Sequence, residues 1–170
     1  MKILVELKEI TGNEGMDIFE MIQEIGGGNR SGFRNSLYAD SYEEFQEKLK
    51  ENVNISKGIG LLSWMVPQMI YWLYVDGKPV GYGKFRYYLT DKLRELGGHI
   101  GYCIRPSERK KGYGTILLGE ILKKAREKGL EEVLLTCDED NIGSRKVIEN
   151  NGGTLEKMSN GVCYYWISLK

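Results

Sequence analysis

The stretch whose residue types most directly indicate chemistry is a basic loop that contains two glycines, Arg109-Lys110-Lys111-Gly112-Tyr113-Gly114-Thr115. A strand-like alternating run from His99 to Ile104 precedes it, and an amphipathic helical pattern follows it. Glycines let the backbone approach a ligand closely, and the free N–H groups and dipole at a helix N-terminus favour negative charge. The loop therefore predicts a binding site for a phosphate-bearing ligand.

The spacing of the loop excludes two common phosphate-binding motifs. A Walker loop needs glycine, four residues and then Gly-Lys-Ser/Thr, a sequence that does not occur in this chain. A dinucleotide-binding fingerprint needs a small residue three places after Gly114, where Leu117 stands. From these residues alone, an ordinary basic turn with glycine caps stays open as the alternative.

Composition limits the classes of partner. The chain has 170 residues, 41% of them hydrophobic and 28% charged, so we expect a single domain spanning residues 1–170. Its 24 Lys and Arg balance its 24 Asp and Glu, which disfavours nucleic acid as a partner. The positive charge between Arg105 and Lys111 is local, and a local cluster favours a small anionic ligand.

The cysteines and the apolar runs indicate whether the protein binds a metal, forms disulfides or enters a membrane. Cys103, Cys137 and Cys163 are an odd number without paired spacing, which argues against a disulfide framework and against a zinc site. The longest apolar run is too short to span a membrane, and no signal-peptide core follows the first residues. We therefore expect a cytoplasmic protein that uses no metal and no membrane partner.

The order of the predicted elements indicates the fold class. Asp76-Gly77 and Asn160-Gly161 each predict a tight hairpin turn, and two later strands are each followed by a helix. These patterns predict an α/β (α+β) fold with a mixed sheet and helices on both faces. Residues 29–40, which include Arg30 and Arg34, are expected to form an exposed loop. The apolar segment from Gly58 to Pro67 fits either a loop packed on the core or a flap over a reacting centre.

Two motifs together resemble the GNAT N-acetyltransferase superfamily. The first is Arg-x-x-Gly-x-Gly, residues 109–114, placed after a strand that ends in Ile-Arg-Pro and before a long amphipathic helix. The second is a strand, residues 133–137, followed by Asn141-Ile142-Gly143-Ser144 and a glycine turn at residues 151–153. The second half of the chain is also similar to a group of bacterial predicted acetyltransferases. The resemblance extends from about Tyr71 to the C-terminus.

The resemblance implies a fold, a cosubstrate and a set of contacts. The implied fold is GNAT-like, a central sheet splayed between its fourth and fifth strands to admit acetyl-CoA. The pyrophosphate is expected on the loop, and the pantetheine arm on the end of the central strand and on the start of the following strand–helix unit. Carried over by position, the contacts are Arg109, Lys110, Lys111, Gly112, Tyr113, Gly114 and Thr115 on the loop, Tyr102, Cys103 and Ile104 on the strand, and Asn141 and Ser144.

The implied reaction is direct attack of a primary amine, on a small molecule or a protein, on the thioester of acetyl-CoA. Many family members carry a tyrosine seven residues after the asparagine as general acid, and Ile148 stands there in this chain. Tyr113, Tyr164 and Tyr165 are unranked substitutes.

His99, the only histidine, is the candidate general base because imidazole titrates near neutrality. It lies one residue out of register with the positions at which family members carry a base. A buried hydrogen-bonded histidine, or proton removal by a water chain, therefore stays open. A covalent acetyl-cysteine on Cys103 or Cys137 has no visible base partner.

A second function of a different class also stays open. The missing tyrosine fits a catalytically silent CoA-binding module, a sensor or an assembly subunit, on the same fold. The identity of the amine acceptor is not encoded in any motif, and a homodimer stays open as the oligomeric state.

Overall fold

The structure is a computed structural model that describes residues 2–27 and 33–170. Seven strands and five α-helices follow one another in these ranges, with one short 3₁₀ turn (η1) before α4. In chain order they are β1 (Val5–Glu9), α1 (Met16–Ile25), α2 (Tyr42–Ser56), β2 (Gln68–Val75), β3 (Lys78–Arg86), α3 (Asp91–Glu95), β4 (Ile100–Ile104), η1 (Pro106–Glu108), α4 (Tyr113–Glu127), β5 (Glu132–Asp138), α5 (Ile142–Asn150), β6 (Thr154–Ser159) and β7 (Val162–Ser168).

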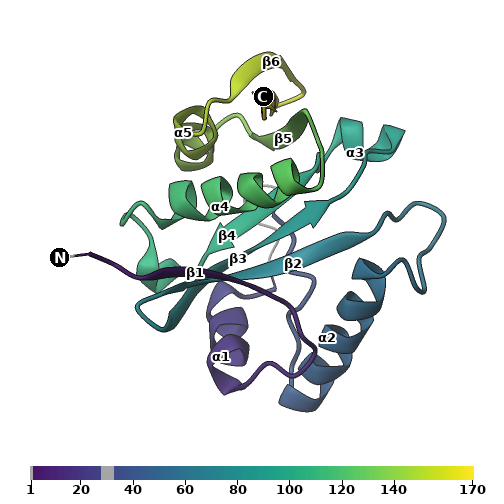
Figure 1. Cartoon of the computed structure of the whole chain (residues 1–170), viewed down its shortest axis with the longest axis vertical. Coiled ribbons are helices and arrows are strands. Elements are labelled where there is room, and N and C mark those ends of the chain that lie inside the picture. Colours follow the sequence, from purple (N-terminus) through teal and green to yellow (C-terminus); the bar gives the residue numbers. More distant parts are fainter. Residues whose placement is uncertain (1, 28–32) are drawn as a thin grey trace.

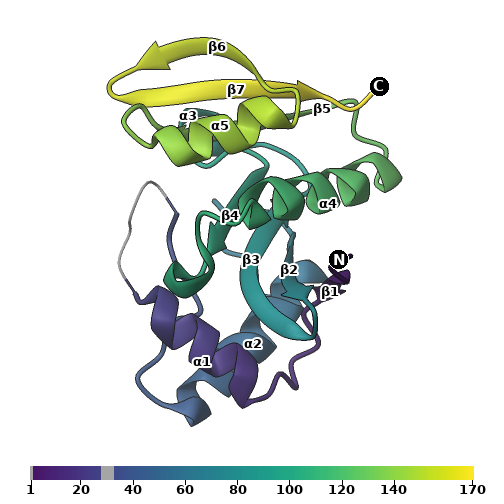
Figure 2. The same ribbon diagram turned by 90° about the vertical axis from the view of Figure 1, so that its left-hand side faces the viewer.

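The strands form two sheets (Figures 1 and 2). The first has the order β1-β2-β3-β4 and the second the order β5-β7-β6. Within the first sheet, Lys84 of β3 lies opposite Gly101 of β4, and in the second Cys137 of β5 lies opposite Cys163 of β7. Helix α4 carries the chain from the first sheet to the second and packs against both (Figure 1), while the sheets themselves meet directly near Gly98 and Leu135.

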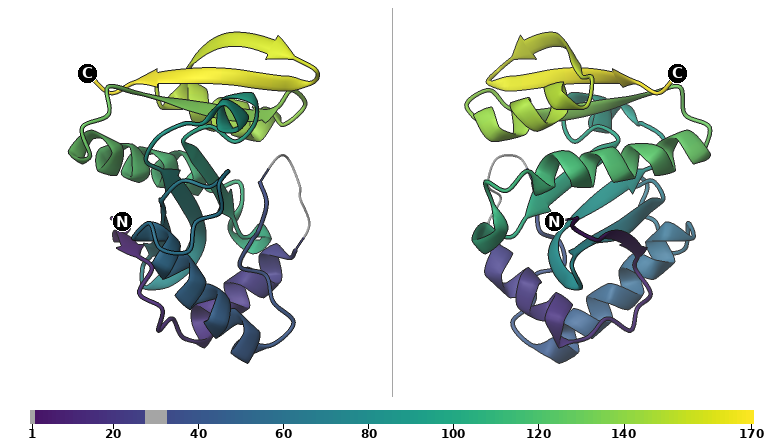
Figure 3. Two further views of the ribbon diagram at one scale, coloured as in Figure 1. Left: turned by 90° about the vertical axis from the view of Figure 1, so that its right-hand side faces the viewer. Right: turned by 60° about the vertical axis from the view of Figure 1, so that its left-hand side comes forward.

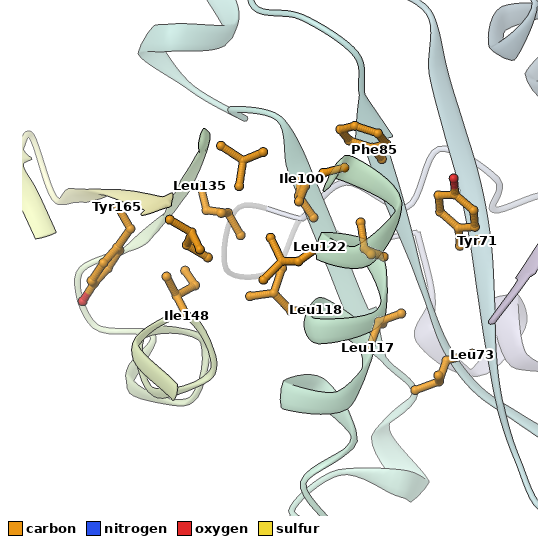
Figure 4. Packing of buried hydrophobic residues seen from close by; sticks show 14 of the residues in the cluster. Tyr71, Leu73, Phe85, Ile100, Leu117, Leu118, Leu122, Leu135, Ile148 and Tyr165 are labelled. Atoms are coloured by element: carbon orange, nitrogen blue, oxygen red, sulfur yellow. The ribbon is translucent and has the colours of Figure 1, made fainter. Parts of the chain in front are cut away.

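Helices cover both faces of the first sheet. Helices α1 and α2 pack on one face around the buried Phe45, Trp72 and Tyr82. Helix α4 packs on the other face and also contacts the second sheet, so its buried leucines lie between Ile100 and Phe85 on one side and residues of β5, β7 and α5 on the other (Figure 4). Burial of the α4 face holds the two sheets together, because this apolar surface is removed from water only when both are in place.

The predicted α/β class and the separation of the fourth strand from the fifth are confirmed. The described ladders are all antiparallel, whereas the sequence led us to expect a mixed sheet. The physical reason is that neither helical crossover joins neighbouring strands. Helix α4 connects β4 to β5, and these two strands separate from each other. Helix α5 connects β5 to β6, and strand β7 lies between these two.

Local predictions from turn and capping residues agree with the structure. Asp76 and Asn160 adopt φ of 50° and 51° before glycines at φ of 80°, as tight hairpin turns require. Ser41 caps α2 by accepting a hydrogen bond from the Glu44 N–H at 3.1 Å. These features depend on neighbouring residues only, and such short-range patterns are readable from sequence.

The expectation of an exposed loop over residues 29–40 holds only in part for the described residues: Arg34, Ser36 and Asp40 are exposed, but the positions between them are not. Asn35, Leu37 and Ala39 are buried, and Asn35 Oδ1 accepts a hydrogen bond from the buried Tyr82 hydroxyl at 2.5 Å. The segment is therefore part of the core beneath β3. Arg30, in the first part of that expected loop, lies outside the described residues. In the described chain no helix is long and apolar enough to cross a membrane.

Candidate active site

The two sheets touch at one point and then part. Gly98 and Leu135 form an isolated bridge, the His99 N–H donates to the Leu134 carbonyl at 2.7 Å, and the Gly97 N–H donates to Thr136 Oγ1 at 3.0 Å. Beyond this point the described ladders pair β4 with β3 on one side only. A cavity of about 820 Å³ opens there, a volume within the usual range for small-molecule sites.

The basic loop lies at one end of this cavity. Gly112 has φ of 83° and precedes the first residue of α4, and the following N–H groups, of Tyr113, Gly114 and Thr115, lie in the first turn, where a helix supplies no partner. A Cβ on Gly114 would lie 3.1 Å from Val147 of α5, so glycine permits close approach of the two helices. The loop therefore presents a backbone anion site.

The side chain of Arg109 has a local partner within the fold. Its Nε donates to the Ile104 carbonyl at 2.9 Å, at the end of β4. Lys111 forms an ion pair with Glu108 at 3.2 Å. Of the predicted contacts, all of which are described in the structure, Lys111 is the one that does not line the cavity. Side chains of the loop thus stabilise its shape, and the anion site is formed mainly by the backbone.

Helix α1 fixes the segment just before the loop. Glu24 accepts from Arg105 at 2.8 Å and from the Ser107 N–H at 2.7 Å. Burial disfavours its charge, but the hydrogen bonds from Ser107 and Arg105 outweigh this and lower the pKa of Glu24 to about 2. The loop is therefore held between α1 and α4.

The opposite wall comes from α5 and the end of β4. Asn141 caps α5, its Oδ1 accepting from the Ser144 N–H at 3.2 Å, and its side-chain amide is free of an intramolecular acceptor among the described contacts. Tyr102 reaches across from β4, and its hydroxyl lies 2.7 Å from Ser144 Oγ. Asn141, Ser144 and Tyr102 all line the cavity. The structure thus brings the predicted pantetheine contacts onto two facing walls.

His99 lies at the junction of the sheets rather than on the described cavity wall. Its Nδ1 accepts a hydrogen bond from the Leu134 N–H at 2.9 Å, and the residue is 8% exposed. Burial, followed by the positive charges of Arg94 and Arg86, lowers the pKa of His99 to about 4. The ring is neutral at pH 7, with its accepting nitrogen already occupied by the backbone.

The tyrosines considered as proton donors lie in different places. Tyr165 is buried and donates to Glu149 at 2.6 Å, and Tyr164 donates to the Glu95 carbonyl at 2.6 Å. Of the three, Tyr113 alone lines the described cavity. Ile148 is fully buried beside the leucines of α4, so the position expected to carry the tyrosine belongs to the core (Figure 4).

Cys103 lines the cavity but is not activated as a nucleophile. Burial raises the pKa of its thiol, and the nearby guanidinium of Arg109 offsets this only in part. A thiol with a raised pKa carries little thiolate at neutral pH.

The other end of the cavity contains residues that sequence reasoning missed. Phe33, Arg34, Lys84 and Arg86 line it together with Thr136. The detectable signal is that Lys84 and Arg86 stand at alternate positions after the buried Tyr82, so that two charged residues share the face of β3 with a core residue. Residues 58–67 do not line the described cavity; Trp64 of this segment lies against Lys92 instead, 5.1 Å from ring centroid to Nζ.

Comparison with known proteins agrees with this geometry. The sequence profile described as the acetyltransferase (GNAT) family matches residues 33–152. No curated protein sequence matches the chain significantly.

Solved structures share the fold at low sequence identity. The ribosomal L7/L12 alpha-N-protein acetyltransferase RimL, in complex with coenzyme A, matches with a TM-score of 0.71 at 17% identity, over 96% of this chain and 93% of that one. The Campylobacter jejuni N-acetyltransferase PseH, in complex with acetyl coenzyme A, matches with a TM-score of 0.65 at 18% identity, over 98% and 100%. The microcin C7 self-immunity acetyltransferase MccE, in complex with acetyl-CoA and AMP, matches with a TM-score of 0.70 at 15% identity, over 96% and 92%.

The chain belongs to the GNAT acetyltransferase family. The prediction of an N-acetyltransferase that takes acetyl-CoA as cosubstrate is thereby confirmed. The role of each site residue stays a prediction.

Proposed function

We propose that the protein transfers the acetyl group of acetyl-CoA to a primary amine by direct attack, in the cavity between β4 and β5. The observation that carries this proposal is the parting of β4 from β5 directly beside the free N–H groups at the start of α4. The loop binds the pyrophosphate, and the unpaired edge of β4 from Tyr102 to Ile104 pairs with the amides of the pantetheine arm. Asn141 donates its side-chain amide to the same arm.

The chemistry balances without a further reactant. The amine nitrogen bonds to the acetyl carbon and the thioester C–S bond breaks, while the amine loses one proton and the departing thiolate gains one. Attack needs a neutral amine, and the positive charges that line the cavity, among them Arg86 and Arg109, favour that form over an ammonium ion.

The cytoplasm is the proposed location. Cys103, Cys137 and Cys163 are free thiols, which fits a reducing compartment. A catalytically silent CoA-binding module is the second candidate, favoured by the core position of Ile148 and by the occupied nitrogen of His99.

A pair of variants at Gly112 tests the site. Both Asn and Asp tolerate a left-handed backbone, and a Cβ at this position meets no atom within 4 Å. Gly112→Asp adds a negative charge where the pyrophosphate is expected, and Gly112→Asn adds nearly the same shape without charge. In calorimetric titration with acetyl-CoA we expect Gly112→Asn to bind within a few-fold of the wild type.

Gly112→Asp should bind at least about tenfold more weakly than Gly112→Asn, a difference that shrinks at high salt. Equal affinities of the two variants would place the pyrophosphate elsewhere. Absence of acetyl-CoA binding by the folded wild type would overturn the proposed function. Binding without release of free thiol on any amine would favour the silent module.

A further inference from the structure

A buried lysine stands in the wall of the cavity at the end away from the phosphate loop. Lys84 is 5% exposed and points to the face of β3 that α1 and α2 cover, the same face as Tyr82. It lies opposite Gly101 of β4, and a Cβ on Gly101 would contact Phe33 at 3.5 Å. Ile104, where β4 ends and the loop region begins, is three residues further on, about 10 Å along an extended strand.

Among the described residues, the ammonium group of Lys84 has neutral partners only. Its Nζ donates to the Arg34 carbonyl at 2.8 Å and to Ser36 Oγ at 3.0 Å, and it lies 5.2 Å from the ring centroid of Phe33. An ammonium has three donors, and the described hydrogen bonds use two of them, which leaves one for a ligand. In the described part of the chain no ion pair includes Lys84.

The charged neighbours of Lys84 are cations as well. Arg86 and Arg34 also line the cavity, and Arg86 donates to the carbonyls of Gly97 and Gly98 at 3.3 and 3.2 Å. Burial, followed by the charges of these two arginines, lowers the pKa of Lys84 to about 7. A buried cation without a counterion is costly, so about half of the Lys84 side chains are neutral at pH 7, and an anion that enters the cavity stabilises the ammonium form.

The remaining charge in the cavity does not compensate the cluster. Arg109, Lys110 and Lys146 line the cavity with the residues of the phosphate site. Glu108, the one carboxylate among the described lining residues, is paired with Lys78 and Lys111, both at 3.2 Å. The cavity thus has two positive ends, and the pyrophosphate of acetyl-CoA accounts for only one of them.

We propose that Lys84, with Arg34 and Arg86 beside it, binds an anionic group of the acceptor. The amine that receives the acetyl group then belongs to a molecule that also carries a carboxylate or a phosphate. This inference rests on the proposed function and names the substrate class of the same site. A charge-assisted contact at this buried position orients the acceptor, because the anion is held at one end while the amine faces the thioester.

Matched amines test the proposal. Each pair shares one amine and differs in the anion: dipeptides with a free or an amidated C-terminus for the carboxylate, and glucosamine 6-phosphate with glucosamine for the phosphate. Turnover is read as free-thiol release from acetyl-CoA, and binding to the CoA-saturated protein is read by calorimetry. We expect the anionic member of at least one pair to show a kcat/KM at least about tenfold above its neutral partner.

Variants assign this preference to Lys84. Lys84→Met keeps the length of the side chain without its charge, and we expect it to reduce the preference roughly 10- to 100-fold through KM. Its affinity for acetyl-CoA should equal that of the wild type. Lys123→Met, on the exposed face of α4, makes the same change of net charge outside the cavity and should leave the preference intact.

Three results would overturn the assignment. The first is equal use of both members of every pair by the wild type. The second is a loss of kcat on anionic and neutral amines alike in Lys84→Met, which would make Lys84 a general base. The third is failure of every anionic member to bind a protein that binds acetyl-CoA. Failure of acetyl-CoA itself to bind would instead remove the proposed function.

Discussion

At the scale of single residues, His99 illustrates how a contact distant in sequence changes the interpretation of a side chain. Its Nδ1 accepts the N–H of Leu134, which places the ring proton on Nε2 in this arrangement. A ring in that state has no free lone pair with which to accept a proton from an amine. The general-base role of His99 stays a prediction. A purely structural role of His99 predicts a different outcome when the residue is replaced.

His99→Asn separates the two roles. The Asn side-chain oxygen can accept the Leu134 N–H, but it does not titrate. If His99 is structural, this variant keeps turnover within a few-fold, whereas His99→Ala leaves a buried N–H unpaired and lowers the free energy of unfolding by about 1–3 kcal/mol. A loss of more than about 100-fold in kcat in His99→Asn, with unchanged stability, would support the base instead.

The acid dependence of stability gives a second measure of the same residue. Because the pKa of His99 is about 4 in the fold and 6.5 as its ordinary value, the unfolded chain binds more protons between these pH values. Stability from this group is therefore complete above about pH 6.5 and is lost as the pH falls towards 4. Urea unfolding should show that the free energy of unfolding falls between about pH 6.5 and pH 4. This fall should be smaller in His99→Asn than in the wild type, by about 1–2 kcal/mol.

At the scale of elements, the contact between β4 and β5 depends on Gly98. Its φ is 61°, and a Cβ would lie 2.3 Å from the Leu134 carbonyl oxygen, a distance that the backbone must relieve by moving. Gly129, at the end of α4, has φ of 91° with no atom within 4 Å of a Cβ. The two glycines share a left-handed backbone, but only Gly98 is also closely packed.

Alanine substitutions at these glycines measure the contact. Gly129→Ala should cost about 1 kcal/mol for the backbone conformation. Gly98→Ala should cost at least about 2 kcal/mol more in urea unfolding, because the bridge to Leu135 must also shift. It should weaken acetyl-CoA binding as well, since the neighbouring Gly97 lines the cavity. An equal loss in the free energy of unfolding for the two variants would mean that the contact between Gly98 and Leu135 accommodates a Cβ without strain.

At the scale of the whole molecule, the ligand is expected to link two layers that otherwise meet through α4, through the contacts around the bridge of Gly98 and Leu135, and through a few side-chain hydrogen bonds (Figure 3). Acetyl-CoA in the cavity would contact β4, α4 and α5 together. Binding to the folded state alone stabilises a protein by about 2.7 kcal/mol at a ligand concentration of 100 times Kd. The gain should be localised at the facing edges of the cavity.

Hydrogen exchange tests this expectation. With saturating acetyl-CoA, amides of β4 from Tyr102 to Ile104 and of the first turn of α4 should exchange at least about tenfold more slowly. Amides of α2, on the far side of the first sheet, should change little, and Gly112→Asp at the same ligand concentration should show reduced protection. Protection spread evenly over α2 and the cavity edges would indicate global stabilisation without a bridging ligand.

Sequence alone determined the features that depend on neighbouring residues. The glycine loop before α4, the buried face of that helix, the hairpin turns at Asp76-Gly77 and Asn160-Gly161 and the cap at Ser41 all follow from local conformational preference and periodicity. Eleven of the twelve predicted cosubstrate contacts, all but Lys111, line the described cavity because they lie on these elements or where they end.

Only the tertiary structure decided what lies opposite a side chain. Leu134 is 35 residues from the histidine that it contacts, and the Arg34 carbonyl is 50 residues from Lys84. Alternation along a strand tells which face a residue takes, but the partner on that face is fixed by how distant segments pack. For this reason the cationic end of the cavity and the occupied nitrogen of His99 became visible only in the folded chain.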